Sequence, residues 1–489
     1  MLFNSYVFLM VFLPITWLIY FGLNRLGKYQ LAAVGLIAAS FVFYGYQNWR
    51  LCLLLAASIL INYVLHCVLT GKVWNRAYRK LILLCGLAVN FGLLFYFKYL
   101  DFAIENINTL IGSQFALRNI VLPLGISFYT FQQVSFVVDS YRGDIERYRF
   151  LEYALFVSFF PQLVAGPIVL HSEMIPQFAD REKRKINFAN MLSGSQYLIL
   201  GLAKKVLLAD AFGRMCSVQQ EVMGSLNSLS AATVILAYTM EIYFDFSGYC
   251  DIAIGIGKLF NIDIPLNFQS PYKAVNIAEF WKRWHITLTR FLTTYVYIPL
   301  GGSRVCKWKI YRNILIVFAL SGLWHGADWS LVIWGVMHGI MMVLYRMTKK
   351  KVDRMPGWLS WAFTFLFLNI SWTFFHTESV VLSLRLFKSV VSGGVGGFTQ
   401  DIVAAVCERN LVIMFAEYFT GGNIVGILSQ IITALWLLGG MAICVAAPSS
   451  HEIVKRDYRR HGYFCLLDIL FFLSVIRLSE VSTFIYFNF

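Results

Sequence analysis

Apolar segments of about twenty residues recur along most of the chain, separated by short polar loops that carry clusters of Lys and Arg. A helix rises about 1.5 Å per residue, so a segment of this length matches the roughly 30 Å hydrocarbon core of a bilayer. The pattern predicts an all-α, polytopic membrane protein with about 11 to 12 transmembrane helices plus re-entrant segments. The predicted crossings are residues 6–23, 30–47, 51–69, 81–98, 119–140, 189–209, 229–250, 311–329, 330–346, 358–375, 430–448 and 464–486.

The basic clusters predict how the chain is oriented. Cytoplasmic loops of membrane proteins are enriched in Lys and Arg. If the chain starts outside, the predicted crossings place every cluster on the same, cytoplasmic face, and both termini outside. Residues 380–428 are then expected to form an external, partner-facing surface. The clusters are residues 71–80, 181–185, 304–312, 346–354 and 455–460.

Two stretches fit no simple crossing. Leu151–Phe178 is apolar but contains Pro161 and Pro167, and polar, charged loops flank it on both sides. We interpret it as a re-entrant hairpin, which a membrane tolerates only where protein or water covers the broken backbone. Cys250–Ser303 is too polar to face lipid and too aromatic to be an unstructured loop.

Composition agrees with a membrane protein and excludes several other classes. Of the 489 residues, 58% are hydrophobic, and the mean hydropathy is +0.65. The net charge of +15 is spread over short loops and forms no continuous stripe, so nucleic-acid binding is not expected. The nine cysteines are scattered without a C-x-x-C pair, which indicates neither a disulfide framework nor a zinc site.

One histidine is predicted to lie deep in the membrane. In the stretch SGLWHGADW, His325 sits between two apolar runs. If a helix enters from the cytoplasm near Arg312, thirteen residues carry His325 roughly 20 Å inward, past the midplane. An ionisable group at that depth either hydrogen-bonds to a neighbouring helix or serves a function in a cavity.

The neighbours of His325 favour a functional site. Gly322 and Gly326 permit close approach of another backbone, and Trp324 and Trp329 are suited to wall a pocket. Asp328 follows three residues after the histidine. On a continuous helix it would share the histidine's face and orient the imidazole, or it would mark the outer interface.

A second group of candidate residues lies in Pro265–Gly302, where Lys282, Arg283 and His285 lie among tryptophans. An amphipathic helix on the cytoplasmic interface would show this pattern. The alternative is a basic mouth that attracts a phosphate-bearing ligand and leads it to a buried base.

Four further ionisable residues receive a structural interpretation. Asp245 and Asp251 lie within or beside a predicted crossing, where carboxylates are usually paired, and Arg or Lys from the next segment is the expected partner. His66 and His338 are interpreted as hydrogen-bonded core histidines.

Several motifs together resemble the membrane-bound O-acyltransferase family, and most closely its bacterial polysaccharide branch, typified by alginate O-acetylation. They are SFYTFQQVSFVVDSYRG, FFPQLVAGPI, FDFSGYCDIAIGIGKLFNIDIPLNF, FWKRWHITLTRFLTTYVYIPLGGSR and SGLWHGADWSLVIWGVMHG. The resemblance implies one helical, funnel-like domain over residues 1–489, with N-terminal helices (1–118), a catalytic core (119–346) and C-terminal helices (347–489). It also implies that His325 is catalytic and that His285 supports it.

The implied activity is transfer of an acetyl group from cytoplasmic acetyl-CoA, without a bound cofactor, for O-acetylation of an exported polysaccharide such as alginate. Histidine suits this chemistry because its usual pKa of about 6.5 makes it a base near neutral pH. The implied setting is the inner membrane of a bacterium, with periplasmic or membrane-anchored acetyltransferases as partners. Candidate substrate-binding residues are Trp324, Asp328, Lys282, Arg283, Asn267 and Asp245.

Two other functions stay open. D-alanyl transfer to teichoic acid occurs in the same family and uses a donor carried on a protein. A proton-coupled transporter would use His325 and the aspartates as a relay, although the two halves of the chain show no related repeats.

Tyr486 lies in the final residues, FIYFNF, which resemble a C-terminal aromatic motif of polysaccharide acylation systems. A tyrosine at the outer face of a membrane is usually an anchor. The alternative hypothesis is that its phenol accepts the acetyl group and passes it outward, because a phenol ionises more readily than a sugar hydroxyl.

Overall fold

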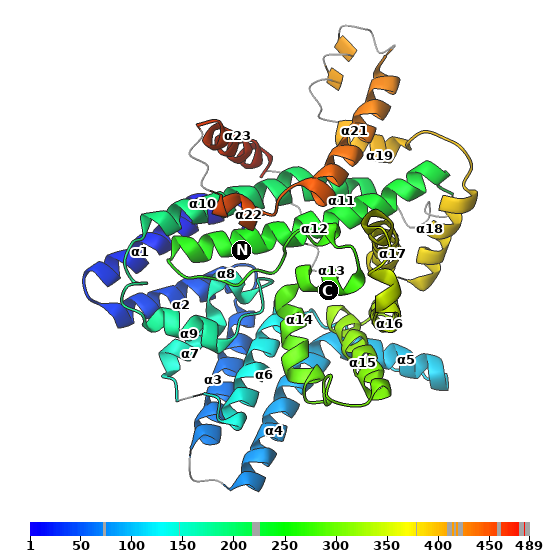
Figure 1. The fold of residues 1–489 in the computed structure, drawn as a ribbon. Helices are drawn as coiled ribbons and strands as arrows, with labels where there is room; N and C mark the ends of the chain where they lie inside the picture. The colour runs from blue at the N-terminus through cyan, green and yellow to red at the C-terminus, as the bar shows by residue number, and fades with distance from the viewer. Residues whose placement is uncertain are drawn as a thin grey trace. The chain divides into compact units, whose positions relative to one another are not determined.

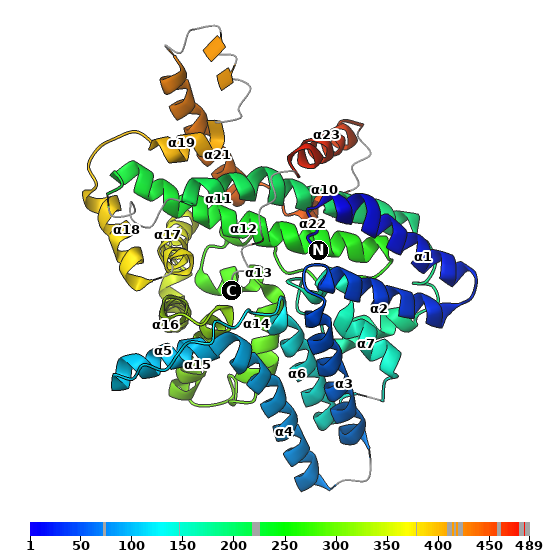
Figure 2. The same ribbon diagram turned by 180° about the vertical axis from the view of Figure 1, so that it is seen from behind.

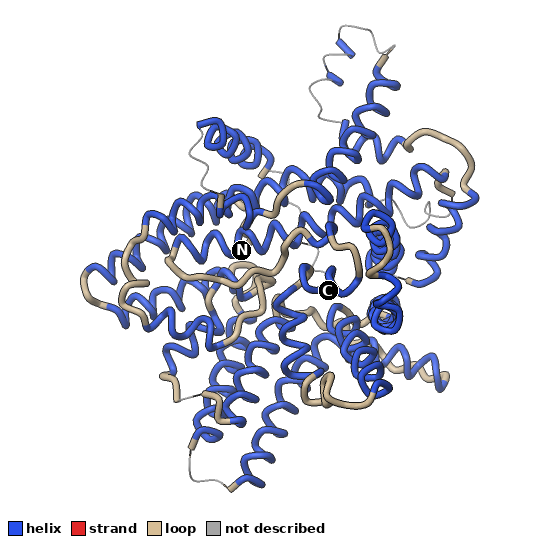
Figure 3. The backbone as a smooth tube through the Cα atoms, in the orientation of Figure 1, coloured by secondary structure: helices blue, strands red, loops and turns tan. Residues whose placement is uncertain are grey.

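The computed structural model describes residues 1–71, 75–145, 147–217, 225–377, 379–407, 413–414, 417–418, 424–456, 461–478 and 484. The described residues are mostly helical and include no β-strand (Figure 3). The all-α prediction is confirmed. Parts of the predicted basic clusters, residues 72–74 and 457–460, and most of 408–423 lie outside the described residues. The chain divides into two compact units.

The first unit comprises residues 1–201, 249–267 and the described residues from 461 to 484. Many of its helices follow one another with short turns, as expected for a membrane bundle. They are η1 (Val7–Phe12), α1 (Leu13–Arg25), α2 (Tyr29–Gly45), α3 (Arg50–Thr70), α4 (Arg76–Leu94), η2 (Phe95–Tyr99), α5 (Leu100–Ile111), α6 (Ile126–Arg142), α7 (Phe150–Ser158), α8 (Phe160–Leu163), α9 (His171–Ala179), α10 (Phe188–Leu202), the end of α12 (Ser228–Leu259) and α23 (His461–Arg477).

A buried polar network joins α3, α4 and α6, which lie side by side in Figures 1 and 2. The Asn90 amide donates to Asn62 Oδ1 at 2.7 Å, and the Asn62 amide donates to Gln133 Oε1. Ser58 Oγ also donates to Gln133 Oε1, at 3.2 Å. Hydrogen bonds of this kind hold helices together in lipid, where packing of apolar surface supplies little driving force.

The segment predicted to be re-entrant is folded as three short helices, α7, α8 and α9. Residues 153–169 are buried. Gly125, with φ +71°, packs against it, because a Cβ there would lie 2.7 Å from the Leu163 carbonyl oxygen. The broken backbone is therefore covered by protein, as the sequence-based interpretation required.

The second unit comprises residues 202–248 and the described residues from 268 to 456. Besides the first part of α12, its helices are η3 (Ala203–Ala209), α11 (Asp210–Cys216), η4 (Pro271–Lys273), α13 (Ile277–Arg283), α14 (Ile286–Leu292), η5 (Thr293–Tyr297), α15 (Lys307–His325), α16 (Trp329–Val352), α17 (Gly357–His376), α18 (Val380–Ser392), α19 (Gln400–Cys407), α21 (Val425–Ala446) and α22 (Ser450–Lys455).

Seven helices in the described residues are long and apolar enough to cross a membrane. These seven helices are Val7–Arg25, Arg50–Thr70, Arg76–Ile111, Ser228–Leu259, Trp329–Val352, Gly357–His376 and Val425–Ala446. The predicted crossing 30–47 corresponds to α2, which has 17 residues and is shorter than these seven.

Several predicted crossings have different bounds in the structure, among them the crossing predicted at 311–329, which ends at His325. The crossing predicted at 119–140 begins at Ile126, because Pro123 and the left-handed Gly125 interrupt the helix. The crossing predicted at 229–250 continues as α12 to Leu259. Of the crossing predicted at 464–486, the structure describes α23 up to Arg477.

The α15–α16 hairpin has an unusually close backbone contact. A Cβ on Gly322 would lie 2.3 Å from the Leu331 carbonyl oxygen, and a Cβ on Gly335 would lie 2.3 Å from the Phe318 carbonyl oxygen. Glycine at both positions lets the two helices touch. The prediction that Gly322 permits close approach is confirmed.

Replacing Gly335 by Ala should therefore destabilise the protein. The added methyl must displace α15, and overpacking of this kind typically costs about 1–3 kcal/mol. We expect a lower midpoint of thermal unfolding in detergent and reduced activity, since α15 ends at His325.

Gly439→Ala is the matched control, because Gly439 lies inside α21 and a Cβ there meets nothing within 4 Å. This control should be neutral or slightly stabilising, since Ala favours a helix over Gly. Equal stability of the two variants would contradict the proposed contact.

Candidate active site

His325 is the last residue of α15 and is 2% exposed. Gly326 has φ −168° and ends the helix, and the chain then turns into α16. The imidazole is thus held at a helix end, inside the second unit.

Aromatic rings surround this imidazole. The ring centroid of His325 lies 4.9 Å from Trp324, 5.2 Å from Trp334 and 5.1 Å from Phe375. The Trp334 and Phe375 rings present near-perpendicular geometries of 88° and 70°. These walls make a site with little room for water, in which electrostatic interactions are stronger than in solution.

His285 joins the same site from another element. It lies between α13 and α14, is fully buried, and its ring centroid is 6.2 Å from that of His325. Its backbone is left-handed, with φ +44° and ψ +51°. A residue other than glycine is uncommon in this region of backbone conformation, and residues with such a strained backbone are often found at functional sites. The structure therefore brings together the two histidines that the sequence singled out.

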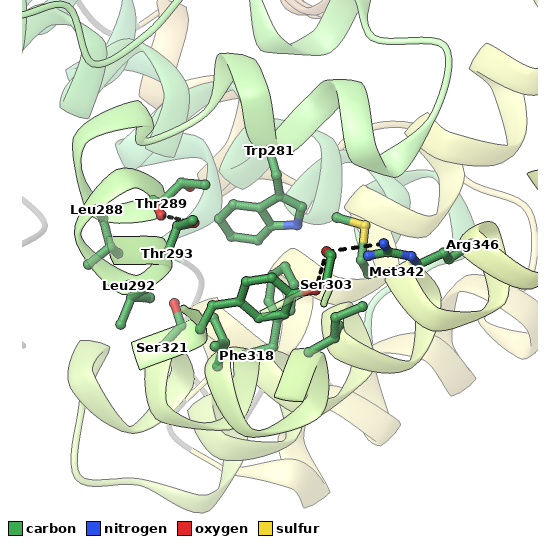
Figure 4. Close-up of a pocket in the computed structure, with 13 residues that line it drawn as sticks. Trp281, Leu288, Thr289, Leu292, Thr293, Ser303, Phe318, Ser321, Met342 and Arg346 are labelled. Carbon is green, nitrogen blue, oxygen red and sulfur yellow. Dashed lines mark hydrogen bonds between the residues drawn. The ribbon is translucent and has the colours of Figure 1, made fainter. Parts of the chain in front are cut away.

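A mostly apolar cavity of about 230 Å³ is lined by residues of the helices that carry or adjoin the two histidines (Figure 4). Its walls come from α13, α14, η5, α15 and α16. Ser321 lines it one helical turn before His325. Trp281, which also lines it, contacts Trp334, with ring centroids 6.0 Å apart. The lining residues are Trp281, Leu288, Thr289, Leu292, Thr293, Tyr297, Ser303, Ile314, Val317, Phe318, Ser321, Met342 and Arg346.

One end of the cavity is polar. Arg346 Nη2 donates to Ser303 Oγ at 3.3 Å, and Ser303 Oγ lies 2.9 Å from the Tyr297 hydroxyl (Figure 4). Lys282, which follows the cavity-lining Trp281 on α13, is exposed. Arg283 is different, because its guanidinium forms a 2.7 Å ion pair with Glu279 and donates to the Gln269 carbonyl oxygen.

The expected geometry of Asp328 is wrong. α15 ends at His325, so Asp328 does not share a helical face with the histidine. It is the N-cap of α16, where its carboxylate accepts a 2.6 Å hydrogen bond from the Ser330 backbone N–H. Trp329, which was expected to wall the pocket, is 55% exposed, whereas Trp324 does contact the imidazole.

Asp245 belongs to a buried charge cluster. Its carboxylate lies 2.6 Å from Lys205 Nζ, and Asp210 lies 2.9 Å from the same ammonium group. All three side chains are almost completely buried. The interpretation of Asp245 as a paired carboxylate is confirmed, but its lysine lies on η3, earlier in the chain than Asp245, and not on the next segment.

The remaining candidates lie elsewhere in the chain. Asn267 belongs to the first unit, where its amide donates to Cys250 Sγ at 3.3 Å. Tyr486 lies outside the described residues. His338 is a core histidine as interpreted, because Trp281 Nε1 donates to its Nδ1 and its Nε2 lies 3.0 Å from Ser371 Oγ. His66 Nδ1 likewise lies 2.8 Å from Ser140 Oγ.

Sequence reasoning missed Trp334, Phe375 and most of the cavity lining. Trp334 directly precedes Gly335, which packs against α15. Its position next to this glycine on α16 was the signal in the sequence that could have indicated its contact with His325. No local pattern marks Phe375, which reaches the site from α17. A second polar cluster was also missed, in which His171 Nε2 lies 3.3 Å from Asp139 Oδ2 in the first unit.

Comparison with known proteins gives a consistent result. Residues 112–384, more than half of the chain, match the model of the membrane-bound O-acyltransferase family, MBOAT. Both site histidines and the complete cavity lie within this range.

Sequence similarity to individual proteins supports this match. The chain is 38% identical over 527 residues to the peptidoglycan O-acetyltransferase of Helicobacter pylori, covering 100% of this chain and 98% of that protein. It is 36% identical over 405 residues to a probable alginate O-acetylase, AlgI, of Pseudomonas aeruginosa, covering 81% and 75%. It is 29% identical over 234 residues to the teichoic acid D-alanyltransferase of Streptococcus thermophilus, covering 45% and 56%.

The charge cluster around Lys205 leads to a prediction. Lys205→Met should be much more destabilising than Asp245→Asn, because it leaves two buried carboxylates without their cation, a loss of about 3–5 kcal/mol. Asp245→Asn leaves Lys205 paired with Asp210. Thermal unfolding in detergent measures this difference.

Asp245 has two candidate roles, as a structural partner of Lys205 and as a substrate-binding residue, and the Michaelis constant for the acyl donor distinguishes them. We expect this constant to be unchanged in folded Asp245→Asn protein. An increase without loss of stability would show that Asp245 binds substrate after all.

Proposed function

Because the chain belongs to the membrane-bound O-acyltransferase family, we propose that it transfers an acetyl group from cytoplasmic acetyl-CoA for O-acetylation of a polysaccharide outside the cytoplasm. The observation that carries this proposal is the close approach of two buried histidines in an aromatic site, where α14 and α15, the helices next to them, also line an apolar cavity. Membership of an acyltransferase family and the full-length similarity to an O-acetyltransferase disfavour the proton-coupled transporter.

His325 acts as the general base in this proposal. It takes the proton from the acceptor hydroxyl, whose oxygen attacks the thioester carbonyl carbon of the donor. The tetrahedral intermediate then breaks its carbon–sulfur bond, and the imidazolium returns the proton to the departing thiolate. One ester and one thiol result, so atoms and charges balance. Such proton transfer typically contributes about 10²–10⁴-fold to the rate.

His285 positions the reacting groups rather than moving the proton. Its ring lies edge-on to Phe246, with centroids 4.8 Å apart and an interplanar angle of 87°. Its left-handed backbone connects α13 to α14, and α14 contributes to the cavity wall. A side chain fixed in this way can hold the donor or the cavity wall in place.

The apolar cavity suits the pantetheine arm and acetyl group of the donor. Its polar end at Arg346 belongs to the basic cluster of residues 346–354, which the positive-inside rule assigns to the cytoplasm. Several phosphate groups of the donor would favour a basic entrance. Lys282 is an exposed cation on α13 and is suited to the same task.

The acceptor is proposed from the relatives. The peptidoglycan O-acetyltransferase of Helicobacter pylori aligns over the whole chain, as does a probable alginate O-acetylase of Pseudomonas putida at 32% identity. The D-alanyltransferase match covers less than half of the chain. We therefore favour acetylation over D-alanylation, with peptidoglycan as the first acceptor to test and alginate-like exopolysaccharide as the second.

A bacterial inner-membrane location with both termini outside, and delivery through a periplasmic or membrane-anchored acetyltransferase, are parts of the same proposal. The hypothesis that Tyr486 relays the acetyl group stays a prediction.

Replacing His325 by Gln should abolish acetyl transfer, lowering the rate by at least about 100-fold, because glutamine cannot act as a base. His285→Asn should retain more activity, since Asn tolerates the left-handed backbone. Both variants should be folded and monodisperse in detergent. Full activity of His325→Gln, or complete loss in His285→Asn alone, would reverse the assigned roles.

The readout also tests the acceptor. Cells lacking the protein are complemented with the natural protein or with His325→Gln, and base-released acetate is measured separately in purified peptidoglycan and in exopolysaccharide. Acetate should disappear from the glycan that the protein serves. D-alanine lost from teichoic acid, with unchanged acetate, would instead support the D-alanyltransferase alternative.

Filling the cavity should weaken donor binding. Val317 lines the cavity on α15. Val317→Trp should raise the Michaelis constant for acetyl-CoA about tenfold or more, since a loss of about 1.4 kcal/mol in binding free energy weakens affinity tenfold. Leu320→Trp is the control, because Leu320 lies on the same helix and is 42% exposed. Equal Michaelis constants in the two variants would exclude this cavity as the donor site.

A further inference from the structure

A large basic cavity in the first unit lies apart in sequence from the motifs of the acyl-transfer site. It has a volume of about 710 Å³ and is formed by the end of α1, the turn into α2 and the loop between α9 and α10. Four cations and one carboxylate line it. These residues are Arg25, Arg181, Arg184, Lys185 and Glu182.

Most of the positive charge in this cavity is not neutralised by the protein. Glu182 is paired with Lys185, with 2.7 Å between the charged atoms. Among the described residues, Arg25 and Arg181 have no carboxylate within ion-pair distance. Concentrated guanidinium groups are suited to phosphate oxygens, to which arginine donates pairs of hydrogen bonds.

The third arginine is held in place. Arg184 stacks over the Tyr29 ring, with its guanidinium carbon 4.9 Å from the centroid, and donates to the Phe178 carbonyl oxygen at 3.1 Å. Arg184 and Tyr29 also line an adjoining cavity of about 290 Å³. The guanidinium is thus oriented before any ligand arrives, which lowers the entropic cost of binding.

The loop that carries these cations is fixed by the end of α12. The buried Asn261 amide donates to the carbonyl oxygens of residues 182, 183 and 185 at 3.2–3.3 Å. Asp263 forms ion pairs with Lys183 and Lys258. Burial raises the pKa of Asp263, but the hydrogen bonds from these lysines outweigh it and hold the pKa below its usual range. Asp263 therefore stays ionised at neutral pH, and the loop stays anchored.

Apolar side chains also line the cavity. Leu18 and Ile186 line it and are 63% and 43% exposed. Close by in sequence, Ile19 and Phe188 are 48% and 79% exposed. In a membrane protein such exposed apolar side chains face lipid, and both the α1–α2 turn and the loop at 181–185 belong to the cytoplasmic side by the positive-inside rule.

From these observations we propose that this cavity binds the phosphate headgroup of an anionic phospholipid of the cytoplasmic leaflet. Arg25, Arg181 and Arg184 contact the phosphate, and the acyl chains lie against Leu18 and Ile186. Basic pockets at this level of a membrane protein suit such headgroups. A soluble phosphate compound would use the cations but would gain nothing from the apolar flank.

The test uses the full-length protein, delipidated in neutral detergent, with lipid binding measured by native mass spectrometry. Phosphatidylglycerol should bind more tightly than phosphatidylcholine. The double variant Arg25→Gln/Arg181→Gln should bind phosphatidylglycerol about twenty-five-fold more weakly, since each cation near an anionic headgroup contributes roughly fivefold. Arg25→Lys/Arg181→Lys should retain most of the binding.

Arg76→Gln/Lys80→Gln is the matched control. It removes the same charge from exposed positions on α4 in a cluster assigned to the same membrane face, and it should bind phosphatidylglycerol like the natural protein. If Arg25→Gln/Arg181→Gln does not fold, Arg181→Gln alone is used, with roughly a fivefold loss expected.

Two results would overturn the proposal. One is equal phosphatidylglycerol affinity in the glutamine variants and the natural protein. The other is inorganic phosphate or glycerol phosphate binding as tightly as the lipid, which would assign the cavity to a soluble phosphate ligand.

Discussion

The backbones of α15 and α16 touch at Gly322 and Gly335, and the candidate active site depends on this contact. His325 ends α15 one turn after Gly322, while Trp334 directly precedes Gly335. Bringing the two glycines together therefore places the indole against the imidazole, 5.2 Å between centroids. A larger residue at either glycine would separate the helices and open the aromatic wall. The position of His325, the proposed base, is thus set by helix packing, and not by the loop that follows it.

A polar group in an apolar interior must be compensated, and the structure shows two means of doing this. In the first unit, neutral amides of Asn62, Asn90 and Gln133 hydrogen-bond to one another across helices. In the second, Lys205 holds the carboxylates of Asp210 and Asp245. Neutral amides hold helices together without burying charge. The ionic cluster carries a larger desolvation cost and tolerates the loss of its cation poorly.

The helical membrane fold, the burial of His325 and the pairing of Asp245 with a cation could be predicted from the sequence. Each of these depends on the apolar composition of the segment around the residue. Prediction from the sequence failed where the backbone departs from a continuous helix. Asp328 was placed on the face of His325 because three residues separate them, but the helix ends between them. Phe375 was missed because its contact with His325 depends on how α17 packs, which no short pattern records.

Both histidines lie where a helix begins or ends, and this has a chemical consequence for the proposed reaction. At a helix end the side chain can point along the axis into a site, whereas a residue in mid-helix faces sideways into a neighbouring helix. His285 reaches this arrangement through a strained left-handed backbone, which the surrounding rings of Phe246, Phe268 and Trp324 stabilise. The same rings limit access of water. Because water competes with the acceptor hydroxyl for the thioester, a base enclosed by aromatic walls favours acyl transfer over hydrolysis.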